Sequence, residues 1–179
     1  MANRLSNKTW IILILGVVII AVGAIVGITL SRSPASPPDF TLPVITWNKT
    51  ILSTLRGTPV VLNFWSISCY WCRQQLPYLE AVALRSGTDM KVIAINMAND
   101  VPAIQKFFGE YEPAMTIAVD ENREAFVEYC LAYNNTAAAI PFTLFLDSEG
   151  TVQYVRIGAF ASEQALRTSL NDFLGITIP

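Results

Sequence analysis

Two cysteines stand where a buried strand is expected to pass into a helix. Residues 59–65 (PVVLNFW) are rich in β-branched and aromatic side chains, which is typical of a central strand covered on both faces. The CYWC motif at residues 69–72 follows, and the segment 69–84 that it opens has helical spacing. A strand that leads through a short loop into a helix is a unit of α/β folds, so this feature constrains the architecture strongly.

The rest of the chain continues the alternation of strands and helices. Strands are predicted at residues 41–44, 50–52, 91–97, 115–119, 142–147 and 151–157, and helices at 100–111, 121–133 and 162–173. The last two strands flank Ser148-Glu149-Gly150, which is typical of an antiparallel hairpin. We therefore expect an α/β fold, a three-layer sandwich with a mixed central sheet.

Two residues inside the predicted helices carry expectations of their own. Pro77 should kink the helix that follows the CYWC motif, because proline removes a backbone donor. Cys130 lies on the same helical face as Phe126 and Tyr129, so it is expected to be a small buried hydrophobic residue.

The apolar residues, which make up 53% of the chain, are concentrated in residues 10–30, where no side chain is charged. As a helix this run would be about 32 Å long, enough to cross a hydrocarbon core of about 30 Å. Arg4 and Lys8 precede it and only Arg32 follows it closely, so residues 1–9 are expected in the cytoplasm. The length favours a retained single-pass membrane anchor over a cleaved signal peptide, with the domain on the periplasmic or extracellular side.

The anchor is followed by a short tether and one domain. Residues 31–38 (SRSPASPP) are rich in proline and serine and are expected to be extended, and residues 39–179 have the size of a single folded unit. Gly23 and Gly27 form a GxxxG pattern in the anchor, which would allow a weak homodimer.

Composition excludes several classes of function. The chain has no histidine, which rules out histidine triads and histidine metal sites, and three cysteines cannot form a four-cysteine zinc site, so no metal is expected. Three of the twelve basic residues and none of the fourteen acidic ones precede residue 39, so the domain has a net charge of −5. Nucleic acid is therefore not an expected partner.

The thiol pair is the remaining candidate for chemistry. At the start of a helix, free amides and the helix dipole favour the thiolate of Cys69. Cys69 would form a mixed disulfide, and Cys72, one turn further in, would resolve it, so that two electrons pass without a cofactor. The alternative is a permanent structural disulfide, which would close only a short loop and contribute little.

The sequence resembles the membrane-anchored thiol-disulfide oxidoreductases of the TlpA/ResA/CcmG family, which are thioredoxin-like. The resemblance lies in residues 37–43 (PPDFTLP), 55–65 (LRGTPVVLNFW), 69–80 (CYWCRQQLPYLE) and 140–150 (IPFTLFLDSEG). It implies a thioredoxin-like fold, with Cys69 as nucleophile, Cys72 as resolving cysteine and Pro141 as a cis-proline beside them. A protein substrate would then pair as an added strand with the backbone of Ile140.

The resemblance also implies partners and supporting residues. Related proteins reduce disulfides such as that of apocytochrome c, and a membrane electron donor resembling DsbD or CcdA recharges them. The side chains expected to support the site are Asn63, Trp65, Tyr70, Trp71 and Gln75. Gln75 replaces a glutamate that is common in the family, and Asn63 stands where cytosolic thioredoxins have a buried aspartate. An amide there forms hydrogen bonds but accepts no proton.

Three functions compete for these residues. The absence of a histidine between the cysteines favours a reductant of protein disulfides over a disulfide-forming oxidant with the same site. A non-catalytic, membrane-tethered interaction domain is the alternative if the pair is inert. A peroxidase fits poorly, because Leu62 stands where peroxiredoxins have proline.

Overall fold

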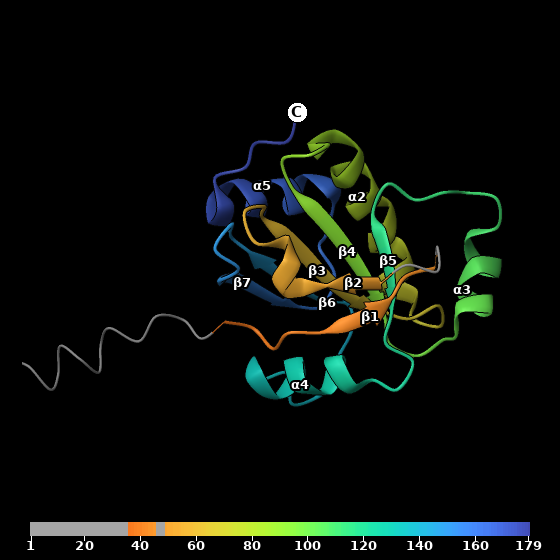
Figure 1. Ribbon diagram of the computed structural model, residues 1–179. Coiled ribbons are helices and arrows are strands. Elements are labelled where there is room, and N and C mark those ends of the chain that lie inside the picture. Colours follow the sequence, from red (N-terminus) through yellow and green to blue (C-terminus); the bar gives the residue numbers. More distant parts are fainter. Residues whose placement is uncertain (1–35, 46–48) are drawn as a thin grey trace, which may run out of the picture. The chain divides into compact units, whose positions relative to one another are not determined.

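A computed structural model of the protein describes residues 36–45 and 49–179 (Figure 1). The predicted cytoplasmic segment (1–9), the predicted anchor (10–30) and residues 31–35 of the tether lie outside the described residues. Within the described part of the chain, no helix combines the length and the apolar character needed to cross a membrane.

A mixed five-stranded sheet forms the centre of the domain. Its strands, in spatial order, are β5 (Thr116–Val119), β4 (Lys91–Asn96), β3 (Val60–Trp65), β6 (Phe142–Leu146) and β7 (Val152–Ile157). The β3, β4 and β5 strands are parallel, whereas β6 is antiparallel to both β3 and β7. All six residues of β3 are buried, as expected for a strand covered on both faces. The predicted mixed sheet and its closing hairpin are confirmed.

Helices cover both faces of this sheet and make three layers (Figure 1). One face packs against α2 (Tyr70–Ser86), α3 (Val101–Phe108) and α5 (Glu163–Leu174). The other face packs against α4 (Glu124–Ala132) and the antiparallel pair β1 (Thr41–Pro43) and β2 (Lys49–Ile51), which a 3₁₀ turn (Leu52–Leu55) follows. The domain therefore has the predicted α/β sandwich architecture, of the thioredoxin-like kind.

All four predicted helices differ from the structure at their ends. α5 begins at Glu163 and ends at Leu174, each one residue after the predicted bound. α2 begins at Tyr70, one residue after the predicted start, and continues through Pro77 without a break. α3 ends at Phe108, before the predicted residue 111, because Gly109 adopts a φ of 61° that leaves the helical region. α4 begins at Glu124 and not at 121, since Arg123 takes a left-handed φ of 63°.

The prediction that Cys130 is buried was wrong. Phe126 and Tyr129 are fully buried under the sheet, but Cys130 is only half-buried at the edge of the same helix face. A short helix presents few positions squarely to the sheet, and residues at the margin of that stripe keep contact with solvent. Burial raises the pKa of the Cys130 thiol, and Arg123 lowers it by a smaller amount.

Candidate active site

Cys69 and Cys72 form a disulfide at the start of α2, directly after β3. Cys69 is the N-terminal cap of the helix, and its Sγ accepts the backbone N–H of Cys72 at 3.1 Å. Cys69 is partly exposed, whereas Cys72 is 1% exposed and belongs to the core. The outer sulfur is thus the one that a second molecule can reach.

The loop between β3 and α2 is held by the ends of two parallel strands. The N–H of Cys69 donates to the carbonyl of Ser66 at 3.2 Å, and the N–H of Ile67 donates to Oδ1 of Asn99 at 3.2 Å. Asn96 is the last residue of β4, and its side-chain oxygen accepts a hydrogen bond from the backbone N–H of Asn99 at 2.9 Å. Sequence reasoning missed both asparagines, although asparagine at the end of a strand is typical of a side-chain-capped turn.

The segment before β6 lies against the outer sulfur. The Ile140–Pro141 peptide bond is cis, which confirms the prediction. The carbonyl oxygen of Ile140 lies 3.8 Å from Sγ of Cys69, although the two residues are 71 positions apart. Pro141 is buried and Ile140 is half-buried. The structure therefore brings together the predicted catalytic and substrate-binding residues.

Behind the disulfide, a buried hydrogen-bond network joins the helix to the sheet. The hydroxyl oxygen of Thr143 on β6 accepts hydrogen bonds from the side-chain amide nitrogens of Asn63 and Gln75, at 2.9 and 3.2 Å. The side-chain oxygen of Gln75 accepts the backbone N–H of Phe160 at 2.9 Å. All four residues are buried, so the predicted supporting residues Asn63 and Gln75 act as structural links. Sequence reasoning missed Thr143 and Phe160.

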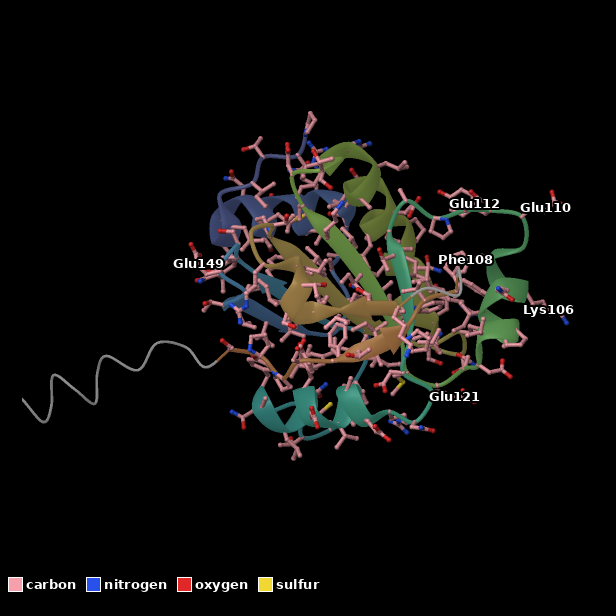
Figure 2. All side chains as sticks on the ribbon, in the orientation of Figure 1. Lys106, Phe108, Glu110, Glu112, Glu121 and Glu149 are labelled. Carbon is pink, nitrogen blue, oxygen red and sulfur yellow. A yellow bond between two sulfur atoms is a disulfide. The ribbon has the colours of Figure 1, made fainter. Side chains whose placement is uncertain are left out.

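The aromatic residues around the motif take two different positions. Trp65 is fully buried and packs against Phe107 and Phe108, with ring centroids 5.5 and 6.0 Å away. Phe108 turns inward from α3 in Figure 2, whereas Lys106 on the same helix points away from the domain. Trp65 therefore supports the site from within the core.

Tyr70 and Trp71, in contrast, stand at the surface between the two cysteines. Tyr70 is 57% exposed and Trp71 is 63% exposed. Their rings contact each other edge to face, with centroids 5.1 Å apart. The pair forms an aromatic surface beside the disulfide.

Glu80, further along α2, fixes the chain between α3 and β5. Its buried carboxylate accepts a hydrogen bond from the hydroxyl of Tyr111 at 2.7 Å. It also accepts hydrogen bonds from the backbone N–H groups of Ala114 and Met115, at 2.8 and 3.3 Å. The hydrogen bond to Glu80 raises the pKa of Tyr111. Sequence reasoning assigned Glu80 no role, and its position two turns after Cys72 on the core-facing side was the available signal.

Residues 35–155 match the AhpC/TSA family, which is most of the chain. The chain belongs to this family. The thiol-disulfide oxidoreductase ResA of Geobacillus kaustophilus is 26% identical over 134 residues, 74% of each chain. The thioredoxin-like protein YneN of Bacillus subtilis is 25% identical over 130 residues, 71% of this chain and 72% of YneN.

A solved structure supports the same assignment. The protein described as the thiol:disulfide interchange protein DsbE from Chlorobium tepidum superposes with a TM-score of 0.68 at 25% identity. The superposition covers 80% of this chain and 99% of that one. With the Cys69–Cys72 pair at the helix start, the chain is a thiol-disulfide oxidoreductase of the ResA and DsbE type.

Proposed function

We propose that the protein reduces disulfides of other proteins outside the cytoplasmic membrane, to which residues 10–30 anchor it. The observation that carries this proposal is the asymmetry of the sulfur pair. Cys69 is accessible beside the Ile140 carbonyl, and Cys72 is buried behind it. Such an arrangement suits an attacking thiol and a resolving thiol.

Electrons pass in two exchange steps. The Cys69 thiolate attacks one sulfur of the substrate disulfide, forms a mixed disulfide and releases the first substrate thiolate. The Cys72 thiolate then attacks Sγ of Cys69 and releases the second substrate thiolate. The protein dithiol is oxidised to a disulfide, the substrate disulfide is reduced to two thiols, and two electrons are transferred.

The backbone at Ile140 would hold the substrate during this exchange. Its carbonyl lies 3.8 Å from Sγ of Cys69 and its side chain is only half-buried. An extended substrate segment that pairs with this backbone as an added strand brings its cysteine next to Cys69. Recognition through the main chain suits proteins with an accessible disulfide, of which apocytochrome c is the substrate we propose.

The direction of electron flow depends on how strongly the thiolate of Cys69 is stabilised. A strongly stabilised thiolate makes a dithiol an oxidant. Here the Cys72 amide donates to this sulfur, and the residues between the cysteines are the uncharged Tyr70 and Trp71. We therefore favour a reductant, which a membrane electron donor resembling DsbD or CcdA would recharge.

The reduction potential of the Cys69–Cys72 pair tests the direction. We expect a value closer to that of thioredoxin, about −270 mV, than to that of DsbA, about −120 mV. A value near that of DsbA would support the disulfide-forming oxidant instead.

Trapping tests the substrate and the compartment. In cells that express Cys72→Ser, mixed disulfides through Cys69 should accumulate, because the resolving thiol is absent. Cys69→Ser, the matched control, should trap nothing through Cys72, which is buried. Trapped proteins confined to the cytoplasm would contradict the proposed location.

A further inference from the structure

The loop between α4 and β6 carries Ile140 to its place beside the reactive sulfur, and one buried side chain organises this loop. Residues 136–138 are exposed, whereas Asn135 is 2% exposed. The side-chain nitrogen of Asn135 donates to the carbonyl of Ala139 at 2.9 Å. Its side-chain oxygen accepts a hydrogen bond from the backbone N–H of Ala139 at 3.0 Å. Asn135 thus binds both polar backbone groups of the residue directly before Ile140.

The backbone of Asn135 is fixed as well as its side chain. Its N–H donates to the carbonyl of Cys130, in the last turn of α4, at 3.0 Å. Its carbonyl accepts a hydrogen bond from the backbone N–H of Ala138 at 2.9 Å. Ala138 has a φ of 47°, a left-handed conformation that alanine rarely adopts. Such a conformation persists only where surrounding contacts enforce it, and the hydrogen bonds of Asn135 are those contacts.

Beyond Ala139 the loop reaches the sulfur pair and then the sheet. The carbonyl oxygen of Ile140 lies 3.8 Å from Sγ of Cys69, and the carbonyl of Pro141 accepts a hydrogen bond from the N–H of Gly158 at 2.8 Å. The backbone at Ile140 is therefore fixed from both sides, by Asn135 through Ala139 and by the segment after β7. The hydrogen bonds of Asn135 are all to residues 130–139, so it acts on the sulfur only through the backbone of Ile140.

We propose that Asn135 is a positioning residue for exchange with polypeptide disulfides, because it fixes the backbone of Ile140 beside Cys69 before a substrate arrives. This inference rests on the proposed function, since it assumes that a substrate segment pairs with Ile140 as an added strand. A fixed backbone loses little conformational entropy when a strand pairs with it, whereas a mobile one must first be ordered. A small disulfide that forms no strand pairing gains nothing from this order.

Two substrates separate positioning from general support of the fold. The whole 179-residue chain is reduced with dithiothreitol, freed of the reagent and mixed with the disulfide-linked dimer of a short peptide or with hydroxyethyl disulfide, which has no backbone to pair. Samples are alkylated with N-ethylmaleimide, and the labelled cysteines of the protein are counted by mass. For Asn135→Ala, we expect the rate constant for the peptide to fall about tenfold and that for hydroxyethyl disulfide to change less than about twofold.

Three further variants assign the effect to the buried amide. Asn135→Ser is the milder variant, because one short hydroxyl does not span both backbone groups of Ala139, and it should lower the ratio of the two rate constants at least about threefold. Thr136→Ala is the matched control in the same loop, since Thr136 is the exposed neighbour. Ile178→Ala controls for stability, because Ile178 is buried on the face of the sheet opposite α4. Both controls should retain the ratio, although Ile178→Ala should unfold at a lower urea concentration.

The outcomes separate this inference from the proposed function. An unchanged ratio in both Asn135 variants would overturn the positioning role and leave the reductase intact. The same would follow if Ile178→Ala lowered the ratio as much as Asn135→Ala, since the loss would then belong to stability. Failure of the unchanged chain to reduce either substrate would overturn the proposed function, and the positioning role with it.

Discussion

The side-chain oxygen of Gln75 accepts a hydrogen bond from the backbone N–H of Phe160 at 2.9 Å. The nitrogen of the same amide donates to the hydroxyl of Thr143 at 3.2 Å, and the side chain is fully buried. Gln75 thus uses a donor and an acceptor at once to tie α2 to β6 and to the segment after β7. A carboxylate has no N–H to donate and would lose its hydration at this position.

Gln75→Glu, which introduces the acid common in the family, should therefore destabilise the fold. We expect a loss of about 1 to 3 kcal/mol at neutral pH. Burial would raise the pKa of the new carboxyl group above its unfolded value of about 4.3, so the folded state favours the protonated form. The loss is thus smallest at low pH, and it grows as the pH rises through the raised folded pKa.

Urea unfolding of the variant and of the unchanged chain at pH 5 and pH 8 measures this effect. Gln74→Glu is the matched control, because Gln74 is the exposed neighbour on the same helix. Its unfolding free energy should shift by less than about 0.5 kcal/mol at either pH. The same pH dependence in both variants would show that burial at position 75 is not the cause.

Thr143→Val tests the network from the strand side. Valine has a similar shape but leaves the amides of Asn63 and Gln75 without the acceptor that both use. We expect a loss of about 2 to 4 kcal/mol in unfolding free energy, measured by urea titration. Thr41→Val, at an exposed position of β1, should change it by less than about 0.5 kcal/mol. A loss no larger than that of the control would mean that the network contributes little.

The sequence was sufficient for the order and type of the elements in the domain. Strand β3 and the helix after it were predictable because burial on both faces and helical spacing are local patterns. The start of α4, in contrast, could not be predicted from local patterns. It depends on the left-handed conformation of Arg123 and on Asp120, whose carboxylate accepts the N–H groups of Ala125 and Phe126 at 3.4 and 2.8 Å. Neither feature has a strong local signature, since arginine rarely adopts a positive φ.

In the candidate site too, residues in local motifs could be predicted and contacts between distant segments could not. The cysteine pair and Pro141 lie in recognisable motifs, so their residues could be named in advance. The partners of Gln75 could not, because Thr143 and Phe160 are 68 and 85 positions away. Hydrogen bonds between distant segments follow from the packing of the whole domain, and no local pattern encodes them.

Reduction of the disulfide should change the intrinsic fluorescence, and most of the change should come from Trp71. Trp71 lies between the bonded cysteines and is exposed, whereas Trp65 is enclosed by core residues. Disulfides quench nearby indoles, so emission should rise on reduction. Spectra of both redox states are compared for Trp71→Phe and Trp65→Phe, with reduction confirmed by thiol counting. Trp71→Phe should lose the response; if it keeps the full response and Trp65→Phe loses it, this assignment is wrong.

In the reduced protein, Cys69 should be the first thiol to react with a limiting amount of iodoacetamide. It is partly exposed at the helix start, where the Cys72 N–H lies 3.1 Å from its sulfur and favours the thiolate. Cys72 is buried, and burial raises the pKa of Cys130. At pH 7 we expect labelling of Cys69 to exceed that of Cys130 by about tenfold or more, as read by mass spectrometry of peptides.

The pH dependence of this labelling separates the two thiols. Raising the pH from 7 to 9 should narrow the difference, because the thiolate of Cys130 becomes populated only as the pH approaches its raised pKa. In Cys69→Ser, the control variant, only the slow labelling of Cys130 should remain at pH 7, since Cys72 stays inaccessible in the core. Preferential labelling of Cys72 or Cys130 in the unchanged chain would reverse the assignment of the attacking cysteine, and the proposed order of the two exchange steps would fall with it.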